Sequence, residues 1–316
     1  MTRRVLIATR TFGSTSKEPW DLLAAAHCET TRIDVDAIGD EAFAAAFADV
    51  DAAIVGSRPI SASIIEGAPR LRVIAMHGVG VDHIDRAAAR EHGVVVANAP
   101  GANSESVADL AFGLLLAVAR RITAESEDVH HGAWTSSLGT EVANKTIGLV
   151  GIGRIGLAVA RRAHGFAMSV LGYDPYLSDD DFAAEGIERV GVDALFARAD
   201  IVSLHVPSTP ETRGIASRER IASMLPTAIL INTARGDLVD EAALYEALAS
   251  GHLAGAGVDT FAHEPPVGNR LLELANVVAT PHIGAHTREA VTRASLMAAR
   301  NVVGVLDSGE AVWPSP

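Results

Sequence analysis

The sequence predicts an α/β protein whose strands form parallel sheets, and three observations support this fold class. Short apolar runs alternate with alanine-rich stretches of helical spacing over most of the chain. A glycine pattern, Gly151-x-Gly153-x-x-Gly156, links one apolar run to a helical stretch. The chain has 316 residues, which is enough for about two domains with separate cores.

The first part of the chain alternates between expected strands and expected helices. The strands are predicted at residues 5–8, 52–55, 73–76 and 94–96. A longer helix is predicted next, with Asn103 or Ser104 as its N-cap and Arg120-Arg121 at its end. Apolar residues occupy most of its circumference, so we expect an interdomain or intersubunit position to cover it. The polar segment 130–145 is predicted to be an irregular connection.

The glycine pattern has the surroundings of a dinucleotide-binding turn, because a strand pattern precedes it and a helical pattern follows. Gly151 permits a tight turn, Gly153 lets the backbone approach a pyrophosphate, and Gly156 lets the helix pack closely on the strand. Backbone N–H groups at the helix start, near Arg154 and Ile155, would face the pyrophosphate. The alternative is a glycine-rich turn without a ligand.

A second strand pattern ends at Asp174, where a carboxylate in such folds accepts hydrogen bonds from the adenosine ribose hydroxyls. This carboxylate would repel a 2′-phosphate, and no arginine follows directly in Tyr173-Asp174-Pro175-Tyr176. We therefore predict NAD as the cofactor.

Four further strands are expected, at residues 201–205, 228–232, 255–259 and 277–280. They extend the nucleotide-binding sheet, and a helix from Thr287 toward Asp307 is expected to pack back on the first domain. The sequence thus predicts two Rossmann-like, doubly wound parallel-sheet domains with a cleft between them. A discontinuous substrate (catalytic) domain would comprise residues 1–98 plus 287–316, and a dinucleotide-binding domain would comprise residues 99–286.

The composition argues against several kinds of partner. The net charge of −13 disfavours nucleic acid and anionic membranes, because both would be repelled at long range. No apolar run approaches the roughly 20 residues of a membrane span. The single cysteine, Cys28, allows no intramolecular disulfide, and the chain start lacks a signal-peptide pattern, so we expect a cytoplasmic protein. We predict no metal site.

Three side chains just after predicted strands suit the reduction of a ketone, since ligands of doubly wound sheets bind outside the carboxyl ends of the strands. His282 would donate a proton to the developing alkoxide, because histidine titrates near neutrality. Arg235 would bind a neighbouring carboxylate through two parallel hydrogen bonds. Glu264 would accept from the second imidazole nitrogen and favour the protonated form. Each residue taken singly also has a purely structural interpretation that is about equally compatible with the sequence. His282 could be an ordinary strand-end histidine, Arg235 a member of a surface ion pair and Glu264 a carboxylate in a turn.

Several motifs occur in an order typical of one enzyme family. They are Gly78-Val79-Gly80-Val81-Asp82, residues 98–120, the glycine pattern with Tyr173-Asp174-Pro175, His205-Val206-Pro207, residues 232–240, Gly257-Val258-Asp259, Glu264-Pro265-Pro266 and Pro281-His282-Ile283-Gly284-Ala285. With these motifs, nearly the whole chain resembles the D-isomer-specific 2-hydroxyacid dehydrogenases, especially their phosphoglycerate dehydrogenase-like branch. The resemblance implies that Arg235, Glu264 and His282 are catalytic, and that the protein is a homodimer formed largely through its nucleotide-binding domains.

The resemblance also implies binding roles. The cofactor would be bound by Gly151, Gly153, Arg154, Ile155, Gly156, Asp174, His205, Val206, Pro207, Thr233, Ala234, Arg235, Asp259, His282 and Gly284. Among these, Asp259 would lie beside the nicotinamide carboxamide. The substrate would be bound by Ser57, Arg58, His77, Gly78, Val79, Arg235 and His282.

The expected function is that of an NAD-dependent oxidoreductase acting on a small D-2-hydroxy acid or 2-keto acid. The first domain would offer the substrate one permanent cation, Arg58, and one titrating group, His77. Since a phosphate needs several charge-assisted hydrogen bonds, we favour glyoxylate or hydroxypyruvate over 3-phosphoglycerate. The branch often carries a long regulatory extension, which does not follow Pro316, so feedback control of that kind is not expected. The alternatives are a same-fold dehydrogenase for formate or phosphonate, and a cofactor-binding, corepressor-like regulator.

Overall fold

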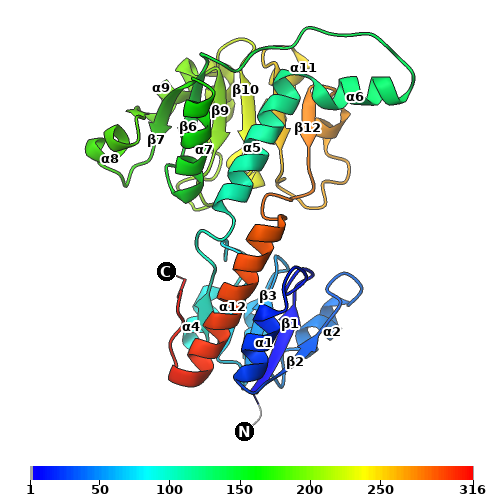
Figure 1. Cartoon of the computed structure of the whole chain (residues 1–316), viewed down its shortest axis with the longest axis vertical. Helices are drawn as coiled ribbons and strands as arrows, with labels where there is room; N and C mark the ends of the chain where they lie inside the picture. Colours follow the sequence, from blue (N-terminus) through cyan, green and yellow to red (C-terminus); the bar gives the residue numbers. More distant parts are fainter. Residues whose placement is uncertain (1–2, 316) are drawn as a thin grey trace. The chain divides into compact units, whose positions relative to one another are not determined.

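The structure, a computed structural model, describes residues 3–315, and the chain divides into two compact units (Figure 1). Unit 1 comprises Met1–Asn103 with Ala285–Pro316, and unit 2 comprises Ser104–Gly284. These boundaries differ by a few residues from those expected from the sequence. Within the described residues, unit 1 holds a five-stranded sheet and unit 2 a seven-stranded sheet.

Both sheets are parallel and doubly wound. The strand orders are β2-β1-β3-β4-β5 in unit 1 and β12-β11-β10-β9-β6-β7-β8 in unit 2. Every paired strand runs parallel to its neighbour. The order reverses at β1 in the first sheet and at β6 in the second, which is the pattern of nucleotide-binding α/β folds. The predicted α/β class with two parallel sheets is confirmed.

Unit 1 covers its sheet with helices on both faces. Its elements are β1 (Arg3–Ala8), α1 (Glu18–Ala25), β2 (Cys28–Arg32), α2 (Asp40–Ala45), β3 (Ala52–Val55), α3 (Ala62–Glu66), β4 (Val73–Met76), α4 (Arg86–Glu91), β5 (Val95–Ala97) and α12 (Arg288–Ser308). Alternate residues of β1 enter different cores, since Leu6 packs in one cluster and Ile7 in the other. A strand buried on both faces shows a continuous apolar run, which is why β1 was predictable.

Helix α12 belongs to unit 1 although it follows unit 2 in the chain. The Thr287 side chain accepts a hydrogen bond from the Ala290 N–H and so caps its start, and Gly309 ends it in a left-handed conformation. The helix lies beside α1 and against β3 and β4 (Figure 1). Val302 and Leu306 fill the same core cluster as Ile7.

Unit 2 follows the same plan around a wider sheet. Its elements are α5 (Ser104–Ala119), α6 (Ile122–His130), β6 (Thr146–Val150), α7 (Arg154–Gly165), β7 (Ser169–Tyr173), α8 (Asp179–Ala184), β8 (Glu188–Arg189), α9 (Val192–Arg198), β9 (Ile201–Leu204), α10 (Arg218–Ser223), β10 (Ile229–Asn232), η1 (Gly236–Leu238), α11 (Glu241–Ala249), β11 (Gly255–Val258), η2 (Arg270–Glu273) and β12 (Val277–Ala279). Helices α5 and α7 cover one face of the sheet, and α9, α10 and α11 pack over the other.

The apolar helix α5 is covered mainly within its own unit. It packs against α7 and against β10, β11 and β12, and a Cβ placed on Gly257 of β11 would come within 2.7 Å of Leu114 Cβ. Gly113 marks its exposed side. Cover from another domain or subunit, which we expected, is therefore not needed for most of this helix. No helix within residues 3–315 is long and apolar enough to cross a membrane.

Candidate active site

The predicted site residues of unit 2 gather at the carboxyl edge of its sheet. Leu204, Asn232, Val258 and Ala279 are aligned across β9, β10, β11 and β12. The residues that follow them are His205, Thr233, Asp259 and Thr280. Because parallel strands end at the same edge, these four polar side chains form one row across neighbouring strands.

Asp259 determines the path of the loop after β12. Its side chain is 1% exposed, and its Oδ1 accepts the Thr280 hydroxyl at 2.6 Å and the Ile283 N–H at 2.8 Å. Its Oδ2 accepts the Gly284 N–H at 2.9 Å. Three charge-assisted hydrogen bonds offset the cost of burying the carboxylate. The sequence indicated the strand-end position of Asp259 but not this engagement with the loop that carries His282.

His282 and Glu264 form a hydrogen-bonded pair. His282 Nδ1 lies 2.8 Å from Glu264 Oε2, and Glu264 Oε1 accepts the Phe261 N–H at 3.1 Å. The His282 backbone is left-handed, with φ of 52°, and its N–H donates to the carbonyl oxygens of Asp259 and Thr280, both at 3.0 Å. Within residues 3–315, His282 Nε2 has no hydrogen-bond partner, so the loop presents one imidazole nitrogen to Glu264 and leaves the other for a ligand.

The pair shifts the proton affinity of both groups. The hydrogen bond from Glu264, helped by its negative charge, raises the pKa of His282 although burial and the Arg235 charge oppose this. Burial would raise the pKa of Glu264, but the His282 hydrogen bond and the charges of His282 and Arg235 together lower it. The arrangement therefore stabilises an imidazolium beside a carboxylate.

Arg235 lies in a turn shaped by its neighbours. Asn232 Nδ2 donates to the Arg235 carbonyl at 2.8 Å, and Asn232 Oδ1 accepts the Ala234 N–H at 3.1 Å. A Cβ on Gly236 would lie 1.9 Å from the Phe261 carbonyl carbon, so a glycine is required for the Arg235 turn to pack on the loop that leads to Glu264. Asn232 was not singled out from the sequence, although a buried asparagine at a strand end is a signal for such a turn.

The glycine turn fits a dinucleotide. Gly151 has φ of +96°, and an added Cβ would meet the His205 carbonyl oxygen at 2.8 Å. A Cβ on Gly153 would have no heavy atom within 4 Å, so space is open above the turn. Helix α7 begins there without a side-chain cap, which leaves its first-turn N–H groups, near Arg154 and Ile155, able to bind an anion.

The rest of the edge also fits this ligand. Asp174 accepts the Ile152 N–H and the Tyr176 N–H, each at 3.0 Å, and both oxygens retain capacity for ribose hydroxyls. Thr233 Oγ1 and His205 Nδ1 are buried without a hydrogen-bond partner in the described chain. Burial lowers the pKa of His205 to about 4, so this side chain is neutral at physiological pH. Unsatisfied buried polar atoms along this edge of the sheet are consistent with a polar ligand there.

The remaining predicted cofactor residues lie in the same loops. Val206 lines the Gly151 turn, and the Pro207 carbonyl accepts the Thr212 hydroxyl at 2.6 Å. The Gly284 carbonyl accepts the Ser106 hydroxyl at 2.6 Å, which ties the His282 loop to the start of α5.

The predicted substrate residues of unit 1 follow β3 and β4, and their environment differs from our expectation. The Arg58 guanidinium donates to the carbonyls of Val35 at 3.2 Å and Ile38 at 3.0 Å and pairs with Asp40 at 2.6 Å. It also lies 4.1 Å from the ring centroid of Phe43. Arg58 thus stabilises the segment before α2. The sequence did not predict this role, because a long arginine side chain can reach partners far from it in the chain.

His77 is also engaged within unit 1. Its Nε2 lies 2.8 Å from Ser295 Oγ of α12, and its Nδ1 lies 3.5 Å from Thr11 Oγ1. Burial lowers the pKa of His77 to about 4, so the expected titrating group is neutral near pH 7. Two hydrogen bonds fix the turn that follows His77. Asn98 Nδ2 donates to the Val79 carbonyl and the Ala99 N–H donates to the Gly78 carbonyl, both at 2.8 Å. Ser57 is exposed.

Comparison with known proteins identifies relatives of this chain. The family described as "D-isomer specific 2-hydroxyacid dehydrogenase, NAD binding domain" matches residues 112–284, more than half of the chain. A D-3-phosphoglycerate dehydrogenase of Mycobacterium tuberculosis is 45% identical over 271 residues, which are 85% of this chain and 51% of the relative. A hydroxypyruvate reductase of Thermotoga maritima is 46% identical over 254 residues, which are 78% of this chain and 82% of the relative.

A solved structure shows the same architecture. A Thermus thermophilus protein, TT0316, is 38% identical with a TM-score of 0.88, covering 99% of this chain and 100% of that protein. The chain spans about half the length of the phosphoglycerate dehydrogenases that it matches. The fold, the glycine turn and these similarities together lead to one assignment: the chain belongs to the D-isomer-specific 2-hydroxyacid dehydrogenase family and contains its NAD-binding domain.

Proposed function

We propose that the protein is an NAD-dependent oxidoreductase that transfers a hydride between nicotinamide and a small D-2-hydroxy acid or 2-keto acid. Unit 2 would bind NAD, and unit 1 would bind part of the substrate. The observation that carries the proposal is the 2.8 Å contact between His282 Nδ1 and Glu264 Oε2, at the sheet edge that also bears the glycine turn. A histidine held by a carboxylate at this edge is the acid–base group that carbonyl reduction requires.

Each of the three residues has a distinct role in this proposal. Reduced nicotinamide, when bound at the glycine turn, would supply the hydride that the carbonyl carbon accepts. His282 Nε2 donates a proton to the carbonyl oxygen as negative charge develops there, and takes it back in the oxidative direction. Glu264 fixes the orientation of the imidazole and stabilises its cationic form. Arg235 binds the carboxylate of the substrate with its guanidinium.

The charges around His282 are balanced for this task. Glu264 and Asp259 favour the imidazolium, and Arg235 disfavours it. A bound substrate carboxylate would neutralise Arg235 and thereby strengthen the proton affinity of His282. Substrate binding would in this way prepare the acid form that reduction consumes.

We propose an unphosphorylated substrate such as glyoxylate or hydroxypyruvate, rather than 3-phosphoglycerate. The environment of unit 1 supports this choice, because the Arg58 guanidinium is bound to the segment that leads into α2 and His77 is neutral near pH 7. A phosphate carries close to two charges and is best bound by several charge-assisted hydrogen bonds. The relatives at similar identity include phosphoglycerate dehydrogenases and a hydroxypyruvate reductase, so their names support both substrates.

A substrate panel tests the function. NADH oxidation would be followed with glyoxylate, hydroxypyruvate, pyruvate and phosphohydroxypyruvate, and NAD reduction with formate and phosphonate. We expect the highest kcat/KM with glyoxylate or hydroxypyruvate. A tenfold preference for phosphohydroxypyruvate, equivalent to about 1.4 kcal/mol, would overturn the choice of substrate. NADH binding without turnover of any 2-keto acid would favour a corepressor-like regulator and overturn the proposed activity.

We also propose that the protein forms a homodimer through unit 2. Helix α6 has no buried residue, and the segment after it exposes Trp134 to 90% and Leu138 to 99%. Ile122 and Val129 of α6 are about half exposed. Large apolar side chains exposed along one segment are typical of an interface, and a second copy of the chain would cover the same segment in a symmetric dimer. Sedimentation velocity would show a dimer for the natural chain and a monomer for the double variant Trp134→Asp, Leu138→Asp.

A further inference from the structure

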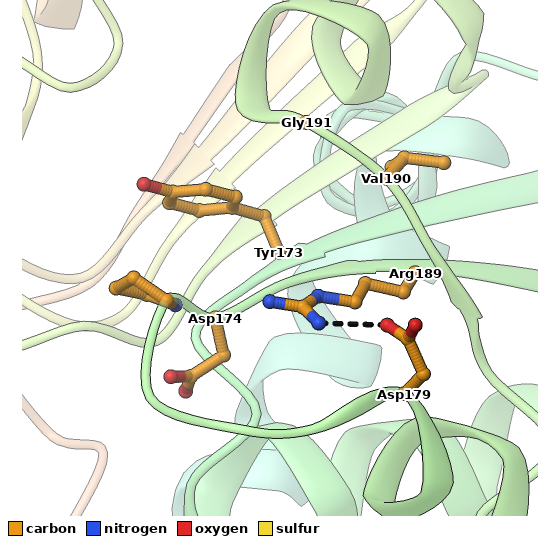
Figure 2. Close-up of a pocket in the computed structure, with 7 residues that line it drawn as sticks. Tyr173, Asp174, Asp179, Arg189, Val190 and Gly191 are labelled. Carbon is orange, nitrogen blue, oxygen red and sulfur yellow. Dashed lines mark hydrogen bonds and ion pairs between the residues drawn. The ribbon is translucent and has the colours of Figure 1, made fainter.

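A pocket of about 480 Å³ opens where β7 and β8 end (Figure 2). It is lined by Tyr173, Asp174, Pro175, Asp179, Arg189, Val190 and Gly191. Asp174 is also the carboxylate that accepts the Ile152 N–H of the glycine turn. The pocket therefore adjoins the position proposed for the adenosine ribose.

Arg189 is the cation in this lining, and most of its donors are unused. Its Nη1 lies 2.7 Å from Asp179 Oδ1, and its guanidinium carbon lies 5.6 Å from the ring centroid of Phe182. A guanidinium has five N–H donors, and within residues 3–315 the Arg189 side chain is hydrogen-bonded to Asp179 alone. Figure 2 shows the guanidinium reaching from β8 toward the Asp174 side of the pocket. An anion entering the pocket would meet these donors.

We propose that the pocket is a phosphate-binding subsite for the 2′ position of the adenosine ribose, with Arg189 as its ligand. The chain then binds 2′-phosphorylated adenosine nucleotides, NADP(H) among them, in addition to NAD(H). This inference rests on the proposed placement of the ribose at Asp174. It identifies a specificity-determining residue that lies 15 positions beyond Asp174 and that the Tyr173–Tyr176 segment alone did not indicate.

The charges of the residues that line the pocket determine whether NAD(H) or NADP(H) binds more tightly. The Arg189 and Asp179 side chains are 41% and 85% exposed, and ion pairs between exposed groups are weak because water screens them and both side chains lose freedom. A phosphate monoester, with nearly two charges and three acceptor oxygens, displaces Asp179 from the guanidinium. Asp174 remains in place through the Ile152 and Tyr176 N–H groups and repels the phosphate. NAD(H) therefore stays preferred, and Arg189 limits how strongly NADP(H) is disfavoured.

Calorimetric titration of the full chain with 5′-AMP and with adenosine 2′,5′-bisphosphate tests this directly, because the two ligands differ only in the 2′-phosphate. Arg189→Leu is expected to weaken bisphosphate binding by about fivefold or more and 5′-AMP binding by less than about twofold. Asp179→Asn is expected to strengthen bisphosphate binding, since it releases the guanidinium. Arg198→Leu is the matched control, because Arg198 is an exposed arginine paired with Glu188 at 2.8 Å outside the pocket lining.

The titrations can overturn the proposed 2′-phosphate subsite in several ways. Equal weakening of both nucleotides by Arg189→Leu would assign Arg189 to the adenosine itself and overturn the subsite, as would no change in either. If the natural chain bound neither nucleotide, the proposed cofactor site would fail together with the subsite. If it bound 5′-AMP and the Arg189→Leu and Arg198→Leu variants behaved alike, only the subsite would fail. Titrations with NADH and NADPH, followed by nicotinamide fluorescence, should show the same order of effects.

Discussion

The carboxylate of Asp259 accepts the backbone N–H of Gly284 at 2.9 Å, just beyond His282 in the chain. The same side chain accepts the Ile283 N–H and the Thr280 hydroxyl, and it is 1% exposed. A buried carboxylate just after β11 thus fixes the loop that carries the proposed proton donor. Its charge also raises the pKa of His282.

Asp259→Asn should destabilise the loop that carries His282 and lower the pKa of the His282 imidazole. The amide replaces one of the two accepting oxygens with an NH2 donor, so at least one of the three hydrogen bonds is lost and the free energy of unfolding should fall by about 1–3 kcal/mol. A displaced His282 should lower kcat by roughly 10²-fold. The lost charge should move the pH at which reduction declines to a lower value. Urea unfolding and kcat against pH check these effects, with Asp193→Asn, at a surface ion pair, as control.

His282→Ala should separate chemistry from cofactor binding. Loss of the proton donor should lower kcat for glyoxylate by about 10²–10⁴-fold, while the Kd for NADH should change by less than about twofold. His263→Ala, at an exposed histidine next to Glu264, should leave both quantities nearly unchanged. Full activity in the His282→Ala variant would remove His282 from the mechanism.

The pH dependence should follow the raised pKa of His282. Reduction needs the protonated imidazole, so kcat/KM for the keto acid should be highest at low pH and fall as pH rises through that pKa. Oxidation of the hydroxy acid should show the opposite trend. Glu264→Gln removes the stabilising charge, so both profiles should shift to lower pH. Profiles that stayed in place would show that Glu264 does not act on the proton of His282.

Arg58→Leu should reduce stability rather than substrate binding. The variant loses the hydrogen bonds to Val35 and Ile38 and the pair with Asp40, which should lower the free energy of unfolding by about 1–3 kcal/mol. The KM for glyoxylate should change by less than about twofold. Arg10→Leu, at an exposed ion pair, should affect neither quantity. A large rise in KM with unchanged stability would instead identify Arg58 as a substrate ligand.

The success of the sequence analysis depended on burial. Strands covered on both faces, such as β1 and β3, show uninterrupted apolar runs that predict them directly. The edge strand β2 reads Cys28-Glu29-Thr30-Thr31-Arg32 and is almost entirely exposed, so no apolar pattern marks it. Helix α6 was missed for the same reason, because none of its residues is buried.

The sequence predicted those site residues whose side chains can take part in the reaction and which also follow a predicted strand. Glu264 and His282 are 18 residues apart in the chain and meet because both follow strands that end at one edge of the sheet. The engagement of Arg58 and His77 was not predictable, since their partners come from distant segments that only the folded chain brings close. Side-chain hydrogen bonds of this kind leave no periodic signal in a sequence.

Helix α12 also sets the order in which the units can finish folding on the ribosome. Strands β1, β3 and β4 are made first, but the helix that covers one of their faces emerges only after all of Ser104–Gly284. At a synthesis rate of 5–20 residues per second, that apolar face of the sheet stays exposed for roughly 10–40 s before α12 is made. Unit 2 is continuous in the chain and can complete its core in that interval. We therefore expect the segment made last to be the one that closes the domain begun first, with chaperones protecting the waiting face.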